Sequence, residues 1–357
     1  MKRLLLVLCV TMALISCGSE EPSPTPNPNN PSPVAPGDDD PEPMPEPEPE
    51  PTPTGSKYIL INQLSGNGNI SLYDAATEKL TEKLIDFGET STVNILASAY
   101  LDNSLYLQTS YPPTIRAIAV DEKTQNHKTL AWGPTGFLIP YTDGVILCSR
   151  PAGFASDDEF LNIKIYNKNL TLLDSLVDVD ILQVNAAILL DNKLFCGVLV
   201  KNVGPSIHIL DLSSKTFLSP IALTTACRQM IKLANTQLLV AENDSYFVTD
   251  TQTLTPSPTT AWGFGADAMT FNSADNLLYI VHPNAQPTTI ANSLYQYNLS
   301  NQQFERISDP NVSISTPILF DANAEVIATG GLSLFGKDGK VLKSISAPSN
   351  TSNIFVR

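Results

Sequence analysis

The sequence predicts an all-β protein built from repeated four-stranded units, and three observations support this prediction. First, an apolar strand that ends in a polar turn residue recurs seven times along the chain. Second, turns followed by short β-rich strands alternate with this pattern, as expected for hairpins. Third, the last residues resemble the strand that the first unit lacks. Four strands in a period of about 44 residues are typical of a β-propeller blade.

The recurring strand ends at seven turn residues: Asp74, Asp121, Asn167, Asp211, Asp250, Asn298 and Gly336. These positions are separated by 47, 46, 44, 39, 48 and 38 residues. Asp, Asn and Gly suit tight turns because they tolerate left-handed dihedral angles or bond nearby backbone amides. The sequence therefore predicts a seven-bladed β-propeller over residues 57–357.

The two ends of this region complete one another. The segment "KYILINQ" at residues 57–63 matches the second strand of the other units, so the first unit has no inner strand of its own. The terminal "SNTSNIFVR" is similar to the first strands "STVNILASAY" and "ILQVNAAILL". We therefore expect the C-terminal strand to close the first blade, which removes the free edges of an open sheet.

The N-terminal residues predict export and lipidation. Lys2 and Arg3 precede an apolar run that is too short to span a bilayer, as in a signal peptide over residues 1–16. The run ends in "LISC", which resembles the bacterial lipobox and predicts lipidation of Cys17. An ordinary secretory signal with a chance cysteine is the alternative. A cysteine that carries two or three acyl chains anchors stably to a membrane.

Residues 17–56 are expected to form an extended spacer. Residues 22–54 hold 14 of the 28 prolines, and residues 18–56 hold nine carboxylates without Lys or Arg. Such a segment cannot form a core. The residues "GSEE" after Cys17 resemble the export signal of Bacteroidetes surface lipoproteins. We therefore expect a lipid-anchored protein of the outer membrane on the cell surface, with the periplasmic face as the alternative.

Charge and cysteine content narrow the function classes. The chain has a formal net charge of −15, and residues 57–357 carry 27 acidic against 19 basic side chains. This balance argues against nucleic acid and anionic lipid headgroups as partners. Cys148, Cys196 and Cys227 have apolar neighbours and no C-x-x-C spacing, which predicts buried thiols; one bridge among them stays open. We expect no metal site and no cofactor.

The two tryptophans occupy matching contexts. "TLAWGPTGFL" contains Trp132 and "TTAWGFGADA" contains Trp262, 130 residues apart, or about three repeats. Both are expected at the end of an outer strand, on one face of the propeller. They are candidate ligand contacts, with packing between blades as the alternative. Long loops and strand starts on the same face add the other binding candidates: Tyr111, Arg150, Phe154, Arg228, Gln229 and His282.

Nothing in the sequence predicts a catalytic residue. The chain has no G-x-S-x-G, H-E-x-x-H or phosphate-loop motif. The three histidines lie in different repeats without metal-ligand spacing. A propeller hydrolase or lyase is therefore the least favoured interpretation, and an enzyme is less expected than a binding protein.

The opening blade and one junction carry a family resemblance. "KYILINQLSGNGNISLYDAATEKL" and "AWGPTGFLIPYTDGVILC" resemble the first blade and a blade junction of YncE-like propellers of Bacteroidetes surface lipoproteins. The resemblance implies capture of a ligand, such as a cobamide or an iron chelate, for a TonB-dependent transporter. A glycan is a further candidate ligand. The alternative function is a protein-interaction scaffold in the cell envelope.

Overall fold

The computed structural model describes residues 55–62, 68–85, 87, 93–110, 113–130, 135–142, 144–150, 160–234, 236–262, 265–283, 292–345 and 351–357. All of them belong to one compact unit, Pro51–Arg357. The signal peptide and Cys17 lie outside the described residues, as do Tyr111, Trp132 and Phe154. The described residues form strands and turns and no helix. Consequently none of them forms a helix that is long and apolar enough to cross a membrane.

The described strands form five separate four-stranded sheets and one seven-stranded sheet. The first sheet has the order β27 (Thr351–Val356), β1 (Lys57–Asn62), β2 (Asn69–Asp74) and β3 (Lys79–Thr81). The second contains β4 (Ile95–Leu101), β5 (Ser104–Ser110), β6 (Pro113–Ala119) and β7 (Thr124–Thr129). The seven-stranded sheet contains β8 (Thr135–Tyr141), β9 (Gly144–Arg150), β10 (Phe160–Asn167), β11 (Leu172–Leu190), β12 (Lys193–Val200), β13 (Gly204–Asp211) and β14 (Thr216–Ala222).

Three more four-stranded sheets follow in chain order. The next contains β15 (Gln229–Ala234), β16 (Gln237–Ala241), β17 (Ser245–Asp250) and β18 (Thr260–Ala261). Its neighbour contains β19 (Ala268–Asn272), β20 (Leu277–Pro283), β21 (Asn292–Asn298) and β22 (Phe304–Arg306). The last contains β23 (Ile318–Asp321), β24 (Val326–Thr329), β25 (Ser333–Gly336) and β26 (Val341–Ser344).

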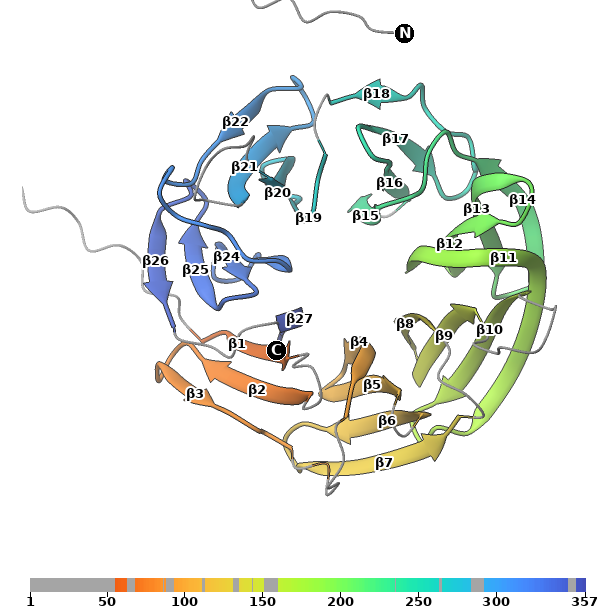
Figure 1. Ribbon diagram of the computed structural model, residues 1–357, viewed down its shortest axis with the longest axis horizontal. Helices are drawn as coiled ribbons and strands as arrows, with labels where there is room; N and C mark the ends of the chain where they lie inside the picture. Colours follow the sequence, from red (N-terminus) through yellow and green to blue (C-terminus); the bar gives the residue numbers. More distant parts are fainter. Residues whose placement is uncertain are drawn as a thin grey trace, which may run out of the picture. The chain divides into compact units, whose positions relative to one another are not determined.

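Within this unit the sheets are arranged radially, as in a β-propeller (Figure 1). Each innermost strand contacts the innermost strand of the next group: β4 with β8, β8 with β11, β11 with β15, β15 with β19, β19 with β23, and β23 with β27. The prediction of an all-β propeller is thus confirmed at the level of architecture. The strand order is sequential except where β27 joins the first sheet.

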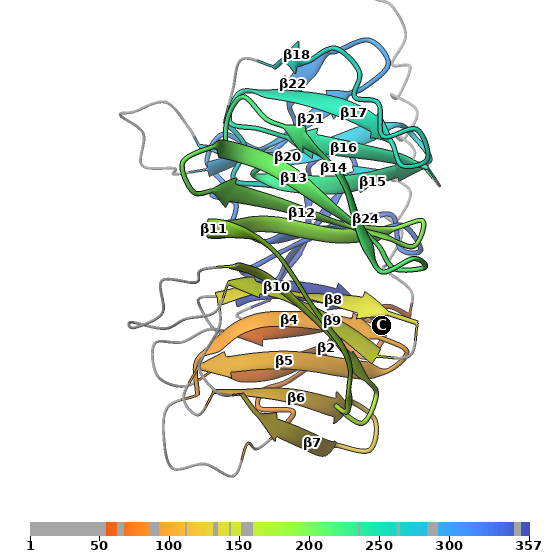
Figure 2. The same cartoon turned by 90° about the vertical axis from the view of Figure 1, so that its right-hand side faces the viewer.

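The seven-stranded sheet differs from the predicted set of separate four-stranded blades. Residues 172–180 of β11 pair with β10, and residues 181–190 pair with β12. The same strand therefore ends one group of strands and begins the next (Figure 2). The sequence "LLDSLVDVDILQVNAAILL" contains no Gly or Pro, so no residue that commonly breaks a strand interrupts the ladder.

The C-terminal strand pairs with the first strand, as the pattern of the last residues predicts. Tyr58 lies opposite Val356, and Ile61 lies opposite Asn353, in an antiparallel ladder. The hydroxyl of Thr351 donates to Oδ1 of the buried Asn62 at 3.0 Å. Polar side chains as well as backbone groups therefore fix the register of this pairing.

A different side-chain bond joins the first sheet to the last. The Tyr58 hydroxyl donates to Asp321 Oδ2 at 2.9 Å, and both residues are buried. Burial raises the pKa of Tyr58 well above its usual value, and the neighbouring Asp321 carboxylate raises it further. The tyrosine therefore stays protonated and serves as a donor to the carboxylate.

The core lies between the sheets and is built from the second strand of each sheet. The strands β1, β9, β16 and β24 are buried over almost their whole length. A strand that is covered on both faces needs a continuous apolar run, such as "YILI" in β1 or "VILC" in β9. The outermost β7 has the polar sequence "TQNHKT" and is largely exposed.

Most of the predicted turn residues bond the backbone that follows them. Asp211 Oδ1 accepts from Ser213 N at 2.8 Å, and Asp250 Oδ1 accepts from Gln252 N at 2.9 Å. Equivalent bonds are formed by Asp74, Asn167 and Asn298. Asp121 instead accepts from Asn103 and pairs with Arg357.

Candidate binding site

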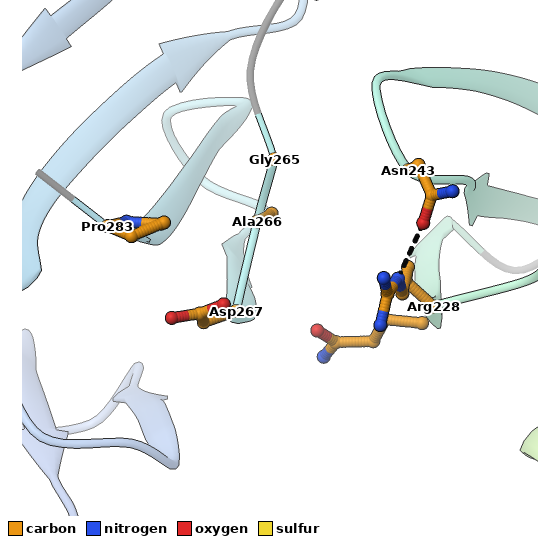
Figure 3. A pocket seen from close by; sticks show the side chains of 7 residues that line it. Arg228, Asn243, Gly265, Ala266, Asp267 and Pro283 are labelled. Carbon is orange, nitrogen blue, oxygen red and sulfur yellow. Dashed lines mark hydrogen bonds between the residues drawn. The ribbon is translucent and has the colours of Figure 1, made fainter. Parts of the chain in front are cut away.

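A polar pocket of about 340 Å³ lies between the β15–β18 sheet and the β19–β22 sheet. Residues from two strand ends and from three connections line it: Arg228, Gln229, Asn243, Gly265, Ala266, Asp267 and Pro283. Figure 3 shows Arg228 and Asn243 on one side and Asp267 and Pro283 on the other. The volume is in the lower part of the range of small-molecule sites.

The first wall consists of the Arg228 guanidinium, which is hydrogen-bonded to the side-chain amide of Asn243. Arg228 Nε donates to Asn243 Oδ1 at 2.7 Å, and the Arg228 amide donates to the Ala241 carbonyl at 2.8 Å. Both side chains are exposed. The pair therefore presents a positive group beside an amide, with the arginine fixed at both its backbone and its side chain.

Hydrogen bonds of the buried Glu242 side chain hold the loop that carries Asn243. This glutamate is 2% exposed, and its Oε1 accepts from the Thr224 and Thr225 amides at 2.7 and 2.9 Å. Its Oε2 accepts from the Ser245 hydroxyl at 3.3 Å. A buried carboxylate with several donors is a rigid support, so the short loop holds Asn243 in place.

The opposite wall consists of the backbone of residues 265–267 and the carboxylate of Asp267. The Asp267 amide donates to the Val281 carbonyl at 2.9 Å, and its exposed side chain lies across the pocket from Arg228 (Figure 3). His282 Nδ1 donates to the Gly265 carbonyl at 2.6 Å. The His282 ring packs edge-on against Tyr295 and Phe304, with centroid distances of 5.6 and 6.2 Å. His282 thus fixes the segment that forms the wall.

Gln229 lines the pocket but uses its amide group to join two sheets. Its Nε2 donates to the Met269 carbonyl at 2.7 Å, and its Oε1 accepts from the Met269 amide at 2.9 Å. These two bonds imitate one step of a β-ladder between β15 and β19. Gln229 therefore fixes the spacing between β15 and β19 beside the pocket.

Trp262 follows the outer strand β18, as expected, but lies in the core beneath this region. It is 8% exposed and packs against Tyr246 at a centroid distance of 4.9 Å and edge-on against Tyr297 at 6.1 Å. These tyrosines come from β17 and β21, so the indole fills the space between two sheets. This placement favours the packing alternative over direct ligand contact.

Arg150, a further predicted site residue in the described part of the chain, does not line this pocket. Arg150 ends β9, and its Nη1 donates to the Leu182 carbonyl of β11 at 2.7 Å. Of the predicted binding residues in the described part, Arg228 and Gln229 line the pocket and His282 supports its wall. No three His, Cys, Asp or Glu among the described residues are grouped so that they could hold a metal ion.

Sequence reasoning did not identify Asn243, Asp267 and Pro283. Asn243 lies in the short loop "ENDS", whereas the prediction favoured long loops. Asp267 lies five residues after Trp262 within the repeated "AWG" context, which marks the connection between two blades. A search that followed the connection beyond the tryptophan would have reached it.

Comparisons with known proteins identify the fold without assigning a family. No protein-family model matches the chain, and no curated protein matches its sequence. A Bacteroides fragilis protein named as a candidate 6-phosphogluconolactonase is similar in structure, with a TM-score of 0.61 and 11% identity over 87% of this chain and 100% of that chain. A chain of the mitotic checkpoint complex gives a TM-score of 0.57 and 10% identity over 80% of this chain and 84% of that chain. At these identities the similarity shows the β-propeller fold alone.

Proposed function

We propose that this protein is a binding module that captures a small polar ligand in the pocket between the β15–β18 and β19–β22 sheets. The observation that carries the proposal is the arrangement of Arg228 and Asn243 opposite Asp267 in a cavity of about 340 Å³. A propeller with fixed strand ends is a rigid scaffold for such a site.

The lining chemistry favours a glycan over the other candidate ligands. Guanidinium, amide and carboxylate groups together offer donors and acceptors to neighbouring hydroxyls, while Ala266 and Pro283 add a small apolar surface. A cobamide or an iron chelate is too large to enter the cavity completely and would contact it through one polar edge. These two ligand classes therefore serve as the comparison in the binding test.

The test is direct binding to the purified protein. A glycan array followed by calorimetry, with a cobamide and a ferric siderophore as further probes, measures which class binds. We expect Asp267→Asn and Arg228→Gln to weaken glycan binding by about tenfold or more, because each removes a charge-assisted hydrogen bond. Lys232→Gln is the matched control, since Lys232 is exposed on β15 and does not line the pocket.

Two results would contradict the proposal. One is the absence of binding to all three ligand classes by the folded protein. The other is binding that Asp267→Asn and Arg228→Gln leave unchanged, which would place the ligand elsewhere on the molecule.

We also propose that the protein is held at the outer membrane through a lipid on Cys17 and hands its ligand to a TonB-dependent transporter. The lipobox-like "LISC" and the proline-rich spacer support this location. Labelling cells with a radioactive fatty acid tests the anchor. We expect the protein to carry the label and the Cys17→Ala variant to lose it. Protease treatment of intact cells distinguishes the cell surface from the periplasmic face, and loss of ligand uptake after gene deletion tests the transporter link.

We further propose that the ring consists of seven blades of the YncE-like type, with the seven-stranded sheet counted as two blades that share β11. The separate pairing of residues 172–180 with β10 and of residues 181–190 with β12 supports this count. Backbone contacts measured by NMR in which residues 172–190 pair with only one of β10 and β12 would contradict it.

A protein-interaction scaffold is the second candidate function, and β11 is the observation that favours it. Four of its apolar side chains are unusually exposed: Leu172, Leu173, Val177 and Leu182. Exposed apolar side chains grouped on one strand are typical of a protein-binding surface. Stable co-purification of an envelope protein, lost in Leu173→Asp together with Val177→Asp, would support this function.

A further inference from the structure

Two cysteines from different parts of the seven-stranded sheet face each other. Cys148 lies in β9 and Cys196 lies in β12, and their Sγ atoms are 3.1 Å apart. Both are almost fully buried, with 0% and 1% of their surfaces exposed, in one hydrophobic cluster. The two strands are not neighbours in the sheet, since β10 and β11 lie between them in the strand order.

We propose that Cys148 and Cys196 form a disulfide bond that links the two halves of the seven-stranded sheet. The separation of their sulfur atoms exceeds a disulfide bond of about 2.05 Å by roughly 1 Å, so the two atoms approach by that distance when the bond forms. The bond would join residues 48 positions apart in the chain.

The third buried cysteine is placed differently and provides a control. Cys227 is 2% exposed and belongs to another hydrophobic cluster. Its thiol donates to the Gln229 carbonyl at 3.8 Å. Burial raises the pKa of the Cys227 thiol to about 12, so it stays protonated and unreactive.

The chemistry requires an oxidant. The two thiols lose two protons and two electrons as the S–S bond forms, and an oxidised dithiol oxidoreductase or glutathione disulfide takes them up to give two thiols. The neighbouring Cys148 thiol and burial raise the pKa of Cys196 well above its usual value, so the thiolate is disfavoured in the folded protein. The bond therefore forms during folding, before the two halves of the sheet cover the sulfur atoms.

The linked loop is long enough for a clear effect on stability. A cross-link restricts the unfolded chain more as the enclosed loop becomes longer. We expect the oxidised protein to melt about 5 °C above the reduced protein. An export location, as proposed above, would supply the oxidant, although the bond itself is tested with the purified protein.

The experiment folds the protein in glutathione disulfide, alkylates it in denaturant and maps the peptides by mass spectrometry. We expect one peptide pair linked through Cys148 and Cys196, with Cys227 alkylated. The melting temperature should fall on reduction in the parent protein and in Cys227→Ser. It should not respond to reduction in the Cys148→Ser and Cys196→Ser double variant.

Recovery of Cys148 and Cys196 in alkylated form from the oxidised, folded protein would overturn the proposal. The peptide map needs no variant, so it gives an answer even if the serine substitutions prevent folding. Neither result depends on ligand binding, because Cys148 and Cys196 are not among the residues that line the pocket.

Discussion

The ring is held together in different ways at two places, and the contrast shows what each junction needs. At the seam, the β27–β1 ladder joins the C-terminal strand to the first sheet, and the Tyr58–Asp321 bond joins that sheet to the last one. In the seven-stranded sheet, β11 runs without a break from β10 to β12. Buried apolar side chains pack at both junctions. The seam adds polar bonds between distant residues, and the seven-stranded sheet adds the continuity of one strand.

The difference follows from chain connectivity. A continuous strand keeps its two halves close through the covalent backbone. Its side chains are therefore not needed to join the two halves. The seam joins residues separated by 263 positions in the case of Tyr58 and Asp321, so bonds formed after folding must hold it. Removing the Tyr58 hydroxyl should therefore weaken the seam, and removing buried apolar volume from β11 should weaken the seven-stranded sheet.

The largest effect is expected from removing residues 351–357. The deletion takes away the inner strand of the first sheet and exposes the edge of β1, which invites pairing between molecules. We expect the melting temperature to fall by more than about 10 °C, with oligomers visible by size-exclusion chromatography.

The control for this deletion removes Arg357 alone and keeps all of β27. It costs one backbone hydrogen bond to the Lys57 carbonyl and the ion pair with Asp121, and a surface ion pair contributes only about 0–1 kcal/mol. Equal losses in the two truncated proteins would show that the β27–β1 ladder does not hold the seam.

A smaller but clear effect is expected from Ile181→Ala at the point where β11 changes partner. Ile181 is fully buried in the cluster between β10 and β12, so the cavity should lower the free energy of unfolding by about 2–5 kcal/mol. Urea denaturation measures the change. Leu182→Ala, at the adjacent and exposed position, should change stability by less than about 0.5 kcal/mol. A similar loss in both variants would contradict the packing argument.

At the seam, Tyr58→Phe should lower the free energy of unfolding by about 1–3 kcal/mol, because the buried Asp321 carboxylate loses a donor. Thermal and urea denaturation both measure this loss. Tyr166→Phe is the matched control, since burial alone raises the pKa of this tyrosine, and its replacement should cost less. If both variants behaved alike, the Tyr58–Asp321 bond would not stabilise the seam.

The smallest expected effect is on the pH dependence of stability, and it comes from turns in the seven-stranded sheet and in the β15–β18 sheet. The amides of Ser213 and Thr253 lower the pKa values of Asp211 and Asp250, respectively, below the ordinary value of 3.8. This contribution to stability is present above pH 3.8 and is lost as the pH falls through the lowered values. Melting temperatures between about pH 5 and pH 2 measure it. Asp211→Asn and Asp250→Asn should flatten the profile, and an unchanged slope would exclude these turns as its source.

The sequence predicts the propeller architecture because the turn bonds and apolar strands that build each blade are local and recur along the chain. Turn residues such as Asp211 and Asp250 bond their own backbone, and the apolar runs of β1 and β9 report burial on both faces. The continuity of β11 was not predicted, because a strand shared by two groups has the same local pattern as two strands joined by a short turn.

The pocket was predicted only in part, for a physical reason. Gln229 begins an inner strand and Arg228 directly precedes it, so their position could be inferred from the repeat. The contribution of Asn243 depends on the buried Glu242 beneath it, and that support is a tertiary contact. Trp262 was a candidate because its repeated context predicts a place on the face with the long loops, whereas its indole packs between tyrosines of β17 and β21.

The pairing of β27 with β1 also has a kinetic consequence. Thr351 bonds Asn62 across 289 residues of sequence, so the first sheet is completed by one of the least local contacts in the molecule. Contacts of this kind slow folding, because a very long loop must close before they form. Until then the backbone groups of β1 stay unpaired on one side, and this interval is when a newly made chain most needs protection by a chaperone.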